Sequence, residues 1–137
     1  MESNDRATWQ FLAMSSIKNF LDLPTDKQIG ETQHFFLIRD GFPVSPGHTL
    51  IISKTLHKDY FELTPDEKSD LENAIGLARS LVEVEYSPDG YNIGMNCGAA
   101  AGQTVFHFHC HLIPRYNGDM ESPRGGVRHV IPSKGNY

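Results

Sequence analysis

Apolar side chains recur at helical spacing in two separate segments of the chain. The first, from about Arg6 to Leu21, predicts an amphipathic helix near the N-terminus that Leu23-Pro24 closes. The second begins at Thr64-Pro65-Asp66-Glu67, which matches a capping box with proline at the first helical position, and its apolar face continues to about Glu85. The pattern therefore predicts one long helix in the middle of the chain and a shorter one before it.

Short runs rich in apolar, aromatic and β-branched residues predict the strands. They are Gln33–Arg39, Thr49–Ser53, Tyr91–Asn96 and Val105–Ile113. Turn-forming residues fill Asp40–Gly47 between the first two strands, and the small residues of Gly98–Gly102 precede the last one. Because these strands flank one long helix without regular βα alternation, we expect an α+β fold with a mostly antiparallel, meander-like sheet.

Length and composition narrow the class of protein. The 137 residues suit one compact domain over 1–137. The two cysteines, Cys97 and Cys110, form no C-x-x-C pair, so neither a disulfide framework nor a cysteine-rich zinc site is expected. No signal peptide or membrane-length apolar run is visible, which predicts a cytoplasmic protein without a membrane partner. The formal net charge of -5 opposes binding to a polynucleotide.

Three histidines at alternate positions are the unusual feature of the last predicted strand. In an extended strand His107, His109 and His111 project to one side, while their neighbours Phe106, Phe108, Cys110 and Leu112 project to the other. Successive imidazoles then lie roughly 6.6 Å apart at the backbone, so the central ring can approach a phosphorus atom while its neighbours reach the oxygens. The spacing suits a tetrahedral oxyanion.

Neutral imidazole is a competent nucleophile near pH 7, and three close rings oppose one another's protonation. Attack of His109 on an α-phosphorus would form a nucleotidyl-histidine that water or another acceptor resolves. Gly102, Gln103 and Thr104 could supply hydrogen-bond donors to the phosphate. Two other functions remain open on the residues alone. A His-x-His pair completed by His48 or a carboxylate could ligate a catalytic zinc, and the same groups could bind a nucleotide without turnover.

The segment His107-Phe108-His109-Cys110-His111-Leu112-Ile113 resembles the His-φ-His-φ-His-φ-φ signature of the histidine triad (HIT) superfamily. Asp40–Ile52 resembles the upstream motif of that family, and Asn92–Arg115 resembles its triad region, so the similarity covers roughly residues 33 to 116. Ala101–Val105 and Ile113-Pro114-Arg115 are closest to the fragile-histidine-triad and bacterial dinucleoside polyphosphate hydrolase branch.

The resemblance implies roles for individual residues. His109 is the expected nucleophile, His107 and His111 orient it and contact the phosphate or scissile oxygen, and Gln103 joins them as a catalytic contact. A further set is expected to bind the nucleotide: Asp40, His48, Asn96, Gly102, Thr104, Phe36 and Ile38. The family fold is an α+β meander that usually forms a homodimer.

The favoured substrate class is a dinucleoside polyphosphate, cleaved or transferred at its α-phosphate. A nucleoside phosphoramidate is the alternative substrate class, and a binding module or a His-ligated zinc enzyme are the alternative functions. No cofactor is expected for the covalent step, although a divalent cation can accompany a polyphosphate substrate. Some bacterial relatives hold a structural zinc with N-terminal cysteines, which this sequence lacks, so we expect no such metal. The leaving group stays open.

Overall fold

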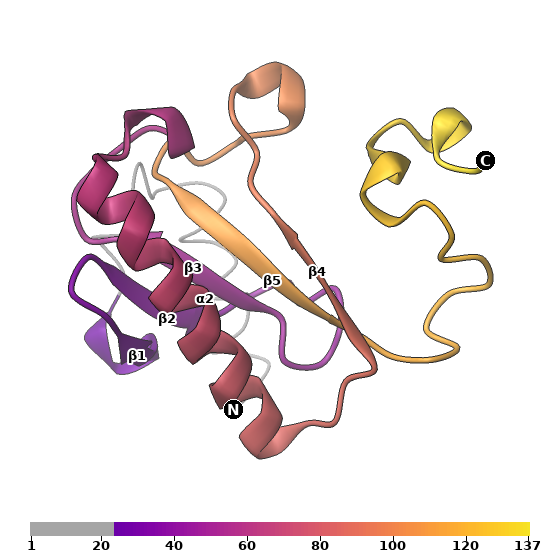
Figure 1. The fold of residues 1–137 in the computed structure, drawn as a ribbon, viewed down its shortest axis with the longest axis horizontal. Helices are drawn as coiled ribbons and strands as arrows, with labels where there is room; N and C mark the ends of the chain where they lie inside the picture. The colour runs from indigo at the N-terminus through magenta and orange to yellow at the C-terminus, as the bar shows by residue number, and fades with distance from the viewer. Residues whose placement is uncertain (1–23) are drawn as a thin grey trace.

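The computed structural model describes residues 24–137. Its centre is a five-stranded antiparallel sheet in the order β1-β2-β3-β5-β4 (Figure 1). The strands are β1 (Gln28–Glu31), β2 (Phe35–Arg39), β3 (Thr49–Ser53), β4 (Gly90–Gly94) and β5 (His109–Arg115). The first three strands form a meander, and β5 then returns between β3 and β4. This order confirms the predicted α+β class.

Helix α2 (Pro65–Glu85) connects β3 to β4 and covers one face of the sheet (Figure 1). Its start follows from local chemistry, because Thr64 Oγ accepts the Glu67 N–H at 3.2 Å while Glu67 Oε1 accepts the Thr64 N–H at 2.8 Å. Its bounds agree with the prediction. Within the described part of the chain, no helix is long and apolar enough to cross a membrane.

The apolar residues form two clusters, one on each face of the sheet. The larger lies between α2 and the sheet, where Phe35 and Phe108 pack edge to face with ring centroids 5.9 Å apart. The smaller one, on the opposite face, contains Phe36, Ile38, Leu50 and Ile52. That opposite face is the one on which two of the triad histidines lie.

Short 3-10 helices complete the described chain. They are η3 (Thr25–Lys27), η4 (Tyr60–Glu62), η5 (Ala99–Ala101), η6 (Gly126–Val130) and η7 (Pro132–Lys134). The last two belong to the C-terminal segment, which extends past β4 at the edge of the sheet (Figure 1).

The structure departs most from the predicted elements at two places, whereas β2 and β4 differ from their predicted bounds by one or two residues. Strand β1 was not predicted, because its sequence QIGE is polar and mostly exposed and so lacks a hydrophobic pattern. The last strand begins at His109 and continues to Arg115, whereas the expected span was Val105–Ile113. The predicted helix from Arg6 to Leu21 lies outside the described residues.

Candidate active site

Two of the three triad histidines project from β5 on the face opposite α2. His109 pairs with Ile52 of β3 and His111 pairs with Leu50, so these four side chains share one face. Cys110 is buried in the larger apolar cluster, and so is Leu112 further along β5. The predicted separation of an imidazole face from an apolar face is therefore confirmed for β5 itself.

His107 departs from that prediction because it lies before the strand begins. Its side chain is fully buried, and its Nε2 lies 2.7 Å from the carbonyl oxygen of Ser53. A carbonyl oxygen only accepts hydrogen bonds, so Nε2 of His107 carries the ring hydrogen. Phe106, expected on the apolar face, is instead 42% exposed because this stretch is not extended strand.

His109 is held by the backbone of His107. Its Nδ1 lies 2.8 Å from the His107 carbonyl oxygen, so Nδ1 carries the hydrogen and Nε2 carries the lone pair in the neutral ring. Burial lowers the pKa of His109, outweighing a hydrogen bond to the His107 carbonyl and the charge of Asp40, both of which raise it. At neutral pH the ring is therefore a neutral base whose Nε2 can act as a nucleophile.

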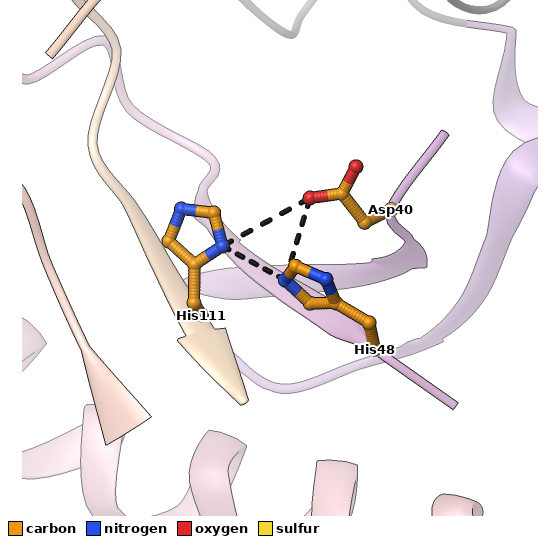
Figure 2. A group of neighbouring side chains, drawn as sticks. All are labelled: Asp40, His48 and His111. Carbon is orange, nitrogen blue, oxygen red and sulfur yellow. Dashed lines mark hydrogen bonds and ion pairs between the residues drawn. The ribbon is translucent and has the colours of Figure 1, made fainter. Parts of the chain in front are cut away.

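His111 lies next to His109 and also meets the loop between β2 and β3. The centroids of the two triad rings are 5.2 Å apart. Nδ1 of His111 lies 2.9 Å from Nε2 of His48, and Oδ2 of Asp40 lies 3.4 Å from the same Nε2 (Figure 2). Burial, with the nearby charges of His109 and His48, lowers the pKa of His111 to about 4.

Asp40, His48 and His111 could in principle hold a metal ion, because one ligand atom from each lies within 4.8 Å of the others. Hydrogen-bond polarity opposes this. The backbone N–H of Val44 donates to Nδ1 of His48 at 3.0 Å, so the hydrogen of the neutral ring must be on Nε2. That nitrogen then has no lone pair for a metal. The group is better described as a hydrogen-bonded cluster, and Asp40 and His48 contact a triad histidine.

Gln103 does not have the free amide that a phosphate contact would need. Its Nε2 donates to the carbonyl oxygens of Lys58 at 2.6 Å and Val105 at 3.2 Å. Its Oε1 accepts the N–H of Gly98 at 2.8 Å. The side chain is 4% exposed. Gln103 therefore holds the loop before the triad in place. Its expected role as a direct catalytic contact stays a prediction.

The other predicted binding residues occupy varied positions. Gly102 follows η5 with φ +94°, a left-handed conformation that favours glycine, and Thr104 is exposed beside it. Phe36 and Ile38 lie on the site face but are only 5% and 1% exposed. Asn96 lines a hollow of about 440 Å³ that His48 and His111 also border. Their contacts with a nucleotide stay predictions.

His57 belongs to the surroundings of the triad, although it lies outside both segments that resemble the family motifs. Its Nε2 lies 2.9 Å from Oε1 of Glu67, and its carbonyl oxygen accepts the N–H of Phe108 at 2.7 Å. Burial lowers the pKa of His107, and the nearby charges of His109 and His57 lower it further. The sequence gives no sign of this role, because the partner of His57, Glu67, is already explained as the capping-box residue of α2.

Comparisons with known proteins agree with this geometry. The HIT domain family model matches residues 24–118. An uncharacterized HIT-like protein of Methanocaldococcus jannaschii is 41% identical over 107 residues, covering 76% of this chain and 81% of that protein. The asymmetrical bis(5'-nucleosyl)-tetraphosphatase of Schizosaccharomyces pombe is 39% identical over 78 residues, 57% of this chain and 43% of that enzyme. The bis(5'-adenosyl)-triphosphatase of Dictyostelium discoideum is 39% identical over 80 residues, 58% of this chain and 54% of that enzyme.

Solved structures of HIT family proteins have the same fold as this chain. A HIT family member from Bacillus subtilis has a TM-score of 0.65 and 30% identity, covering 84% of this chain and 77% of that one. A Zn-bound histidine triad family protein from Mycobacterium smegmatis has a TM-score of 0.64 and 40% identity, covering 74% and 73%. The chain spans 62% to 65% of the length of similar HIT proteins from two Mycoplasma species and B. subtilis. The family match, the antiparallel sheet and the histidine cluster together place this chain in the HIT domain family.

Proposed function

We propose that this protein cleaves or transfers a nucleoside monophosphate group through a covalent intermediate on Nε2 of His109. The observation that carries the proposal is the bond between Nδ1 of His109 and the carbonyl oxygen of His107, 2.8 Å long. It directs the lone pair of the neutral ring to Nε2, where it can attack phosphorus. Burial of the ring lowers the pKa of His109 and so favours its neutral form at pH 7.

The reaction has two displacements. Nε2 of His109 attacks the α-phosphorus, and the N–P bond forms as the P–O bond to the leaving group breaks. The departing oxygen keeps the electron pair of that bond and takes a proton from the solvent. Water then attacks the phosphorus, the N–P bond breaks, and the nucleoside monophosphate and a proton are released. Dividing one displacement into two gives each a better nucleophile or leaving group than direct attack by water.

We propose a dinucleoside polyphosphate as the substrate. Two relatives named above act, according to their names, on bis(5'-nucleosyl) tetraphosphate and bis(5'-adenosyl) triphosphate. The covalent intermediate would suit a transferase equally well, because another acceptor can replace water in the second step. No metal is needed to generate the nucleophile in this scheme. A metal chelator should therefore leave turnover of an adenosine phosphoramidate unchanged. This substrate is the suitable one for the test because it has no polyphosphate chain whose charge a divalent cation would screen.

Turnover by a His109→Asn variant tests the nucleophile. The panel contains diadenosine tri- and tetraphosphate and an adenosine phosphoramidate, and His34→Asn serves as the matched substitution at a histidine outside the cluster. We expect His109→Asn to lose at least about 10³-fold in kcat on every substrate that the wild type cleaves, while His34→Asn retains activity. Equal turnover by His109→Asn and wild type would refute the assignment. The order of kcat/KM within the panel identifies the leaving group.

A further inference from the structure

We propose that His57 and Glu67 are positioning residues that keep the hydrogen of the His109 ring on Nδ1. Both act through the backbone, by way of the peptide group that joins His107 to Phe108. This role rests on the proposed function, in which the unprotonated Nε2 of His109 attacks phosphorus. It assigns a task to a hydrogen-bonded pair that lies between the first turn of α2 and the loop before the triad.

The peptide group between His107 and Phe108 is bonded on both sides. Its carbonyl oxygen accepts the hydrogen on Nδ1 of His109 at 2.8 Å, and its N–H donates to the carbonyl oxygen of His57 at 2.7 Å. A trans peptide group is planar, with its C=O and N–H on opposite sides. Turning this plane would therefore break both bonds. The His57 carbonyl thus sets the direction of the carbonyl that holds His109.

The sheet gives this peptide group little support of its own. Strand β5 begins at His109, which pairs with Ile52 of β3. Before that point, the Phe108 carbonyl oxygen accepts the Ser53 N–H at 3.4 Å, which is long for such a bond. The orientation of the peptide group therefore depends on the loop between β3 and η4, where His57 lies.

Glu67 anchors that loop through the His57 ring. Nε2 of His57 lies 2.9 Å from Oε1 and 3.0 Å from Oε2 of Glu67, and the Glu67 side chain is 5% exposed. Burial raises the pKa of Glu67, but hydrogen bonds from Thr64 and His57 bring it below its ordinary value. The ionised carboxylate only accepts, so Nε2 of His57 donates. Because Glu67 Oε1 also accepts the Thr64 N–H at 2.8 Å, the carboxylate is fixed to the start of α2.

The consequence for the nucleophile follows from the two tautomers of a neutral imidazole. With a fixed carbonyl acceptor at Nδ1, the hydrogen stays there and Nε2 keeps its lone pair. Without the anchor on His57, the loop and the peptide group can turn away from the His109 ring. The hydrogen can then exchange to Nε2, and a protonated Nε2 has no electron pair for phosphorus.

Nitrogen-15 NMR of the ¹⁵N-histidine-labelled protein reads the tautomer without any substrate. The wild type is expected to show His109 with a protonated Nδ1 and an unprotonated Nε2, and His109→Asn identifies these signals. His57→Leu removes the bond to Glu67, so its two His109 shifts should move toward each other as the hydrogen is shared. In His57→Gln the amide still donates to Glu67, and the wild-type pattern should return. Wild-type His109 shifts in a folded His57→Leu protein would overturn the proposal.

Kinetics with a matched control separate positioning from helix stability. We expect His57→Leu to lose about 10-fold in kcat/KM on the substrate that the wild type cleaves fastest, and His57→Gln to retain most of it. Thr64→Ala weakens the start of α2 but leaves the His57–Glu67 bond in place, so it should retain kcat/KM. An equal loss in Thr64→Ala, or a loss in His57→Leu without a change of tautomer, would overturn positioning.

A measurement on the wild type keeps the test independent of whether His57→Leu folds, which circular dichroism checks. A scalar coupling between the Phe108 amide nitrogen and the His57 carbonyl carbon reports their hydrogen bond directly, with the β3–β5 pairs as internal standards. Absence of this coupling would overturn the proposal. Absence of wild-type turnover on every substrate, with the expected change of tautomer in His57→Leu, would support positioning and count against the proposed function instead.

Discussion

The neutral state of the buried histidines makes stability depend on pH, and His111 allows a quantitative test. Its pKa falls from 6.5 to about 4 because burial and two neighbouring histidines oppose the charged form. In the unfolded chain the same ring takes up a proton near its ordinary pKa. Between pH 6.5 and 4 the unfolded state therefore binds more protons, so the free energy of unfolding decreases as the pH is lowered through this range. Above pH 6.5 this contribution is fully present.

The magnitude follows from the two pKa values. The complete shift corresponds to about 3 kcal/mol, of which about 2 kcal/mol is already lost at pH 5. The pKa values of His48, His107 and His109 are also lowered, with burial as the main cause, so they add losses of the same sign. A total stability of about 5 to 15 kcal/mol makes such a loss readily measurable.

Urea unfolding followed by far-UV circular dichroism at pH 7.5, 6.5, 5.5 and 5.0 measures the effect. His111→Asn cannot take up this proton, so its stability should decrease less than that of the wild type, by up to about 2 kcal/mol at pH 5. Each protein is compared with itself at pH 7.5, which removes the cost of the substitution. Carboxylates such as Asp119, whose pKa is lowered to about 2, act at lower pH and stay outside this window. Parallel pH profiles for the two proteins would show that His111 does not take up a proton on unfolding in this range.

Three smaller predictions concern the surroundings of the site. Thr64→Ala removes the side-chain half of the capping box and should cost about 1 kcal/mol in urea unfolding, whereas no change would mean that Glu67 alone caps the helix. Gln103→Ala leaves buried backbone groups unpaired and should lower the free energy of unfolding by about 1 to 3 kcal/mol. An unchanged stability together with a raised KM would instead favour a direct contact between Gln103 and the phosphate. Burial raises the pKa of the Cys110 thiol to about 12, so Ellman's reagent at pH 8 should modify Cys97 in the folded protein and Cys110 only after unfolding.

Local sequence signals predicted the parts of the fold that local chemistry determines. The capping box predicts the first residue of α2 correctly, and the apolar face predicts its length. The apolar, β-branched run of β3 predicts a strand, and all five of its residues are buried. The polar strand β1 has no such signal, since its place in the sheet comes from backbone bonds to β2. Strand β5 begins late because the Phe108 N–H bonds to the carbonyl oxygen of His57 rather than continuing the ladder.

The candidate site also combines features that the local sequence predicts with features that depend on contacts between distant residues. The alternation of His109 and His111 is visible in sequence because a strand has period two. The contact of His48 with His111 joins residues 63 positions apart, so only the paired strands reveal it. Gln103 illustrates the converse case, because its position in the motif suggests a ligand while its neighbours in space are backbone carbonyls.

The covalent intermediate on His109 can be observed directly. The protein is mixed with excess diadenosine tetraphosphate, quenched at alkaline pH because an N–P bond on histidine is labile in acid, digested and analysed by mass spectrometry. We expect an added AMP group on His109 that forms at least as fast as product and disappears when substrate is exhausted. Product formation at the full rate without that adduct, or with the adduct on a different residue, would contradict covalent catalysis by His109.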